Sequence, residues 1–64
     1  MKIYKIEITL KDKTSIEFEA TSYKETEEFI KFKNEIRDFY DWYSIKDILK
    51  LHIDYIGNIK ESLK

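Results

Sequence analysis

The sequence predicts a small α+β domain, a β-hairpin followed by one long helix and a third strand. Apolar and polar residues alternate through the first twenty positions, aromatic residues recur at helical spacing between positions 22 and 43, and alternation returns after Leu49. A chain of 64 residues has room for a single domain with one core, residues 1–64. The predicted order is ββαβ, an antiparallel sheet packed on one helix.

Residues 2–21 predict the hairpin. Two alternating runs flank Lys11–Thr14, and a three-residue loop lets their apolar faces coincide. The expected register pairs Ile8 with Ile16 and Ile6 with Phe18. It also sets two charged pairs opposite each other: Lys5 with Glu19, and Glu7 with Glu17.

Residues 22–43 predict an amphipathic helix, because six large apolar residues fall in one band at about 100° per residue. These are Phe29, Phe32, Ile36, Phe39, Tyr40 and Tyr43. Ser22 suits the N-cap, and Glu25 stands at the spacing of a capping box. We expect the hairpin to cover the aromatic band, since an isolated hairpin is marginal in water.

Residues 45–64 are compatible with two interpretations. As a helix they would give a ββαα domain. As a strand over residues 48–56 they alternate cleanly, and the Gly57–Asn58 pair is a stop signal. We favour the strand, with residues 57–64 as a tail or a short helical turn.

Composition narrows the class of partner. Twelve basic and 13 acidic residues give a net charge of −1, which offers no general attraction to polyphosphates or anionic lipids. We therefore expect nucleic acid to be an unlikely partner and expect no membrane association. No apolar run approaches about 18 residues and the amino terminus begins an alternating strand, so the expected compartment is the cytoplasm. The Lys-, Ile- and Tyr-rich, proline-free composition is typical of a low-GC bacterium or one of its phages.

The residues that usually carry catalysis are scarce. His52 is the single histidine, cysteine is absent, and the single glycine excludes a glycine-rich phosphate loop. One histidine among scattered carboxylates does not make a metal site. We expect no enzymatic activity, no cofactor and no metal.

Aromatic and acidic residues supply the candidate contacts with a partner. The segment Asp38–Tyr43 holds four aromatic residues, and Trp42 falls off the helix's apolar band. Its indole either lies under the third strand or is exposed as an anchor. A second candidate is an acidic ledge on the outer side of the hairpin. The predicted partner-binding residues are Trp42, Tyr40, Asp41, Glu7, Glu17 and Glu19.

These features predict a non-catalytic protein–protein interaction module that is encoded by a phage or mobile element and inhibits or modulates a host protein. We expect the module itself to form a homodimer. A small nucleic-acid-binding regulator using the basic residues of the helix is the alternative.

The layout of Phe18, Glu19, Phe29 and Leu49–Asp54 around a Ser-capped acidic helix resembles the small phage-encoded inhibitors of uracil-DNA glycosylase. The resemblance implies a dimeric α+β protein that occupies an enzyme's DNA groove with acidic and aromatic residues. A DNA-mimicking inhibitor is therefore a further alternative.

Overall fold

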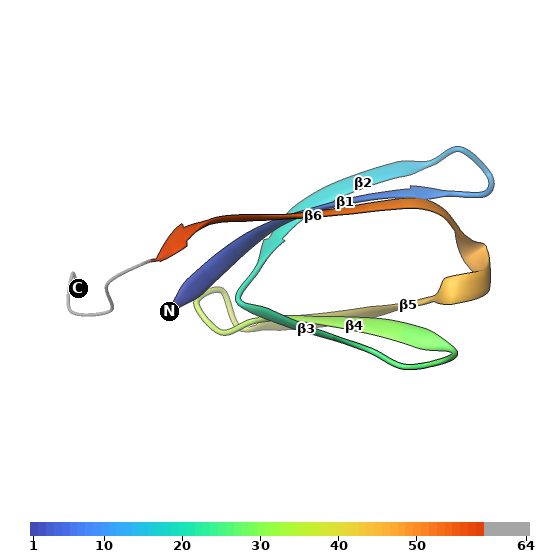
Figure 1. The fold of residues 1–64 in the computed structure, drawn as a ribbon. Helices are drawn as coiled ribbons and strands as arrows, with labels where there is room; N and C mark the ends of the chain where they lie inside the picture. The colour runs from blue at the N-terminus through green and yellow to red at the C-terminus, as the bar shows by residue number, and fades with distance from the viewer. Residues whose placement is uncertain (59–64) are drawn as a thin grey trace.

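The chain forms two three-stranded antiparallel sheets that lie one above the other (Figure 1). The computed structural model describes residues 1–58. Its elements are β1 (Lys2–Leu10), β2 (Ser15–Ala20), β3 (Ser22–Glu25), β4 (Phe29–Asn34), β5 (Phe39–Ser44), the 3-10 turn η1 (Ile45–Asp47) and β6 (Ile48–Asn58). The strand orders are β2-β1-β6 and β3-β4-β5. The prediction of an α+β domain is wrong, because η1 is the only helical element within residues 1–58.

The helix expected over residues 22–43 is replaced by three strands, β3, β4 and β5. Tyr, Phe, Ile and Trp favour strands, and the segment is rich in them. Two turns without glycine or proline hid the strand boundaries. In the first, Thr26 Oγ1 accepts a hydrogen bond from Phe29 N–H at 3.1 Å, and Thr26 N–H donates to Phe29 O at 2.8 Å. In the second, Asp38 takes a left-handed φ of 58°.

The hairpin prediction is confirmed down to its register. β1 pairs with β2 so that Ile8 faces Ile16 and Ile6 faces Phe18. Leu10 N–H donates to Thr14 O at 2.9 Å, which closes a three-residue loop. Within this loop Lys13 takes a φ of 73°, as the last position of such a loop requires.

The third strand is also confirmed, as β6, and it pairs antiparallel with β1. The helical alternative for residues 45–64 fails over the described part, where only η1 is helical. Gly57 and Asn58 extend β6 instead of beginning a tail. The remainder of the predicted tail, residues 59–64, lies outside the described residues.

The core lies between the sheets and is built from both. Its buried members come from β1, β2 and β4: Ile6, Ile8, Ala20, Ile30 and Phe32. The ring of Phe18 on β2 joins the layers, with its centroid 5.2 Å from that of Phe32 and 5.9 Å from that of Phe39. Of the expected aromatic band, Phe32, Phe39 and Tyr43 do pack against Phe18 of the hairpin, although from a second sheet. The expectation is wrong for Phe29 and Tyr40, which face away from the hairpin.

A buried polar link fixes the crossing from one sheet to the other. Thr21 is the single residue between β2 and β3, and its N–H donates to Lys33 O at 2.7 Å. Asn34, 3% exposed, donates from Nδ2 to Glu19 O at 2.9 Å. Its Oδ1 accepts from Ile36 N–H and Arg37 N–H at 3.0 and 2.9 Å. These bonds hold the end of β2 against the turn that follows β4.

Within residues 1–58 no helix is long and apolar enough to cross a membrane.

Candidate binding face

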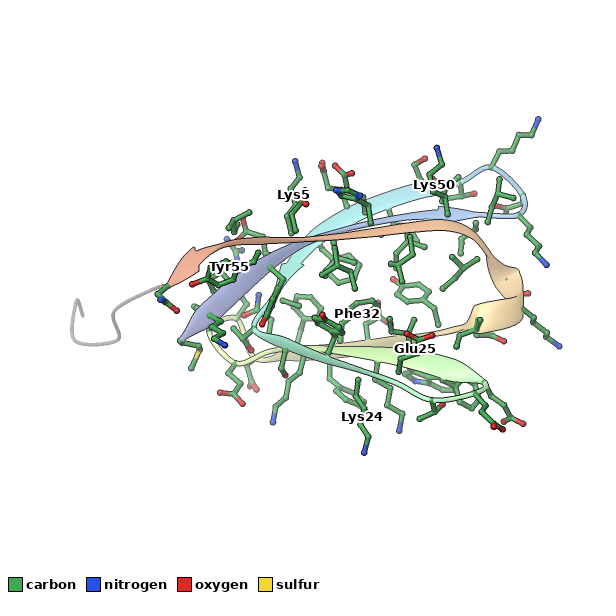
Figure 2. The ribbon with its side chains drawn as sticks, in the orientation of Figure 1. Lys5, Lys24, Glu25, Phe32, Lys50 and Tyr55 are labelled. Atoms are coloured by element: carbon green, nitrogen blue, oxygen red, sulfur yellow. The ribbon has the colours of Figure 1, made fainter. Side chains whose placement is uncertain are left out.

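Alternation along β3, β4 and β5 divides their side chains between the core and the outer surface. Phe32 points between the sheets, whereas Lys24 points away from them (Figure 2). We call the outer surface of this sheet the lysine–aromatic face. Its defining residues are Lys24, Phe29, Lys31, Lys33, Tyr40 and Trp42.

The aromatic part of the face is largely uncovered. Tyr40 is 60% exposed and Trp42 is 52% exposed. The Phe29 and Trp42 rings meet edge to face, with centroids 4.7 Å apart and an interplanar angle of 77°. Phe29 on β4 therefore supports the indole on β5, in an arrangement that aromatic pairs favour. Of the two interpretations of Trp42, the structure has the exposed one.

The basic part of the face carries charge that the chain does little to balance. Lys24 lies directly opposite Lys31 in the β3–β4 register, and like charges so placed destabilise a sheet. Neither lysine has an ion pair within residues 1–58. Lys33 Nζ lies 3.5 Å from Glu35 Oε2, but both side chains are about half exposed, so the pair is weak.

The outer surface of the other sheet is built differently, and we call it the ion-paired face. Lys5 Nζ lies 3.0 Å from Glu17 Oε2 and 3.6 Å from Glu7 Oε2. Hydrogen bonding to Glu17, and then its charge, raises the pKa of Lys5; the same hydrogen bond lowers the pKa of Glu17. Further along, His52 Nε2 lies 2.9 Å from Asp54 Oδ1.

The structure distributes the predicted partner-binding residues over three places. Trp42 and Tyr40 lie on the lysine–aromatic face. The glutamates Glu7, Glu17 and Glu19 lie on the exposed side of the hairpin, on the ion-paired face.

Asp41 faces inward from β5, opposite Phe32 in the β4–β5 register. Its Oδ2 accepts a hydrogen bond from Tyr43 Oη at 2.8 Å, and its Oδ1 accepts from Trp42 N–H at 2.9 Å. Burial, together with this carboxylate, raises the pKa of Tyr43 to about 12. The carboxylate therefore braces β5 from within.

Sequence reasoning missed Phe29 and the three lysines as members of one face. At helical spacing the lysines intersperse with the glutamates of the same segment and appear balanced. A period of two would have found them, because Phe29, Lys31 and Lys33 alternate with Ile30, Phe32 and Asn34. The same alternation separates Tyr40 and Trp42 from Asp41 and Tyr43.

Two shallow depressions lie on this face. One of about 180 Å³ is lined by Phe29, Lys31, Tyr40 and Trp42, and one of about 290 Å³ has Lys24, Lys31, Lys33 and Tyr40 in its lining. Both volumes are below the roughly 300–1,000 Å³ of small-molecule sites. Over the described part of the chain, no three metal-ligating side chains come together.

Comparison of the chain with protein-family models, curated proteins and solved structures finds no match. The resemblance in layout to uracil-DNA glycosylase inhibitors depended on the helix over residues 22–43, which the structure replaces with strands.

Proposed function

We propose that this chain is a non-catalytic binding module that holds a negatively charged partner on the lysine–aromatic face. One observation carries the proposal: exposed Tyr40 and Trp42 stand beside a row of lysines on the same side of one sheet. The proposal keeps the predicted contacts at Trp42 and Tyr40. On sequence grounds we also propose that the binding takes place in the cytoplasm.

Packing of the core does not explain the positions of the Tyr40 and Trp42 rings. Both lie on the side of β5 that faces away from the core, and each remains more than half exposed. Large aromatic residues carry much of the binding energy in protein interfaces when a partner covers them. Lysines beside them add electrostatic selection for an anionic partner.

The acidic residues of the hairpin contribute less to the proposal. Glu7 and Glu17 both lie against Lys5, so their charge is partly balanced within the chain. A DNA mimic needs an uncompensated row of negative charge, and of the three glutamates along β1 and β2 only Glu19 has no ion pair within residues 1–58. We therefore place the contacts with the partner on the other sheet.

The test is capture from a bacterial lysate with immobilised protein, recording both the proteins and the nucleic acids that are retained. The informative variant is Tyr40→Ala/Trp42→Ala. Its matched control is Leu49→Ala, because Leu49 is also 60% exposed but lies on β6, in the other sheet. We expect at least one species to be retained by wild type and control and lost with the double variant.

Circular dichroism of all three proteins checks that the sheets persist. Identical retained species for the double variant and the control would contradict the proposal, since the face would then contribute nothing to binding.

A further inference from the structure

The cross-strand register sets a row of lysines beside a row of aromatic rings. Lys31 faces Trp42 and Lys33 faces Tyr40 across the β4–β5 pair. Side chains so paired stand about 4.5–5.5 Å apart at Cβ. Lys24 on β3 widens the basic row beyond Lys31. A ligand lying along the strands would meet positive charge on one side and flat apolar surface on the other.

The spacing of the two rings favours an extended chain of planar groups. Tyr40 and Trp42 are two residues apart on β5, which corresponds to about 6.7 Å. Adjacent nucleotides in a duplex rise by about 3.4 Å along each strand. Bases seated on both rings would thus be drawn apart from each other, which a single strand allows and a stacked duplex resists.

The charges favour a polyanion over an acidic protein surface. Lysine is depleted at the centre of protein–protein interfaces, yet Lys31 lies on the central strand of this face, between Lys24 and Trp42. Phosphate groups would also relieve the repulsion between Lys24 and Lys31. The shallow depression beside Lys31 suits a polymer laid across the sheet better than an enclosed small molecule.

We propose that the lysine–aromatic face binds single-stranded nucleic acid, with bases stacked on Tyr40 and Trp42 and phosphates held by Lys24, Lys31 and Lys33. This inference rests on the proposed function and names the class of its partner. It departs from the expectation drawn from net charge, because the three lysines gather on one side of a sheet that the sequence did not predict.

Binding is measured by fluorescence anisotropy of labelled oligothymidylate and oligouridylate of about 12 nucleotides, within the site sizes of single-strand binders. Comparing the two probes shows whether DNA or RNA is preferred. We expect a dissociation constant of about 10⁻⁴–10⁻⁶ M, the range of sequence-independent binding. Three phosphate contacts predict a slope of about −2 for the logarithm of affinity against the logarithm of salt concentration.

The variants separate stacking from charge. Trp42→Ala is expected to weaken binding between about 5-fold and about 150-fold through lost stacking, and Trp42→Phe to restore part of it. Lys31→Gln is expected to reduce the salt slope by about 0.7. Leu49→Ala, on the other sheet, is expected to leave affinity and slope unchanged.

Three results would overturn the inference: equal affinity for a duplex of the same sequence, equal affinity for polyglutamate, or no anisotropy change with either oligonucleotide. If a protein were still captured from lysate in a Tyr40- and Trp42-dependent manner, the proposed function would stand and the nucleic-acid assignment alone would fail. If capture from lysate did not depend on Tyr40 and Trp42 either, the proposed function and the nucleic-acid assignment would both fail.

Discussion

The two outer surfaces of this molecule both carry lysines, but only one of them also carries carboxylates at its outward strand positions. On the ion-paired face, Lys5 lies between Glu7 and Glu17, so its positive charge is paired with carboxylates of the same sheet. On the lysine–aromatic face, Lys24 faces Lys31 and no carboxylate stands at an outward strand position.

The difference supports placing the proposed binding surface where residues 1–58 leave exposed charge without an ion pair. Tyr40 and Trp42 are exposed on that same surface, although the ring of Tyr55, on β6 of the other sheet, is also more than half exposed.

The largest expected effect separates the two sides of the β3-β4-β5 sheet. Phe32 is fully buried, so Phe32→Ala should cost about 3–5 kcal/mol of unfolding free energy, enough to unfold much of so small a domain. Trp42→Ala should cost only about 0.5–1.5 kcal/mol, because the indole lies outside the core and loses little more than its edge-to-face contact with Phe29. Urea denaturation followed by circular dichroism measures both.

Phe32→Leu, which retains part of the side-chain volume, should fall between these two variants. A Trp42→Ala protein as unstable as Phe32→Ala would show that the indole is a core residue, and the contrast between the sides of the sheet would disappear.

The buried link between the sheets gives the next largest effect. Asn34→Ala removes the donor to Glu19 O and the acceptor for two backbone N–H groups, which leaves buried polar groups unpaired. We expect a loss of about 1–3 kcal/mol in unfolding free energy. Asn58→Ala, at the exposed end of β6, is the matched control and should be nearly neutral. Equal losses of unfolding free energy in Asn34→Ala and Asn58→Ala would show that the Asn34 hydrogen bonds do not hold the two sheets together.

Acid should remove the contribution of Glu17 to the ion-paired face. Because the folded state lowers the pKa of Glu17, its contribution is present above the ordinary pKa and is lost as pH falls through the folded value. Thermal melting from about pH 7 to about pH 3 should therefore converge for wild type and Glu17→Gln at the acid end. Lys31→Gln removes the repulsion from Lys24, so its melting temperature should differ from that of wild type by a similar amount at every pH in this range. A constant difference between wild type and Glu17→Gln would contradict the assigned ion pair.

The homodimer expected from the sequence remains a prediction. Dimerisation should change the two faces less than any of the substitutions above. Among residues 1–58, the sheet order leaves one edge of β6 unpaired and open to pairing with another copy. The register shift between Ile3 and Tyr4 leaves Ile56 as an extra, exposed residue of β6. We expect sedimentation equilibrium to show a dimer that Ile56→Lys weakens and Trp42→Ala does not. A monomer at all concentrations would show the prediction to be wrong.

The sequence predicted about half of the fold, and the residues show why. Strict alternation with a three-residue loop was enough to give the β1–β2 register, and alternation around His52 was enough to give β6. Between Ser22 and Ser44 the turns use Thr26 and Asn34 side chains in place of glycine or proline, so no boundary was visible. Aromatic residues spaced for two short strands then matched a helical band by coincidence.

The candidate site could be predicted only in part for the same reason. Trp42 and Tyr40 stood out because bulky aromatic residues cluster there. The lysines did not, since their grouping depends on which residues face each other across β3, β4 and β5. Cross-strand partners far apart in sequence cannot be identified until the turns between them are known.

Nuclear magnetic resonance mapping of an oligothymidylate titration tests the central contrast most directly. The account predicts that amide and side-chain shifts will concentrate at Lys31, Lys33, Tyr40 and Trp42, while Lys5 and its partners on the ion-paired face stay unchanged. Shifts spread evenly over both faces, or confined to Lys5 and its neighbours, would contradict it.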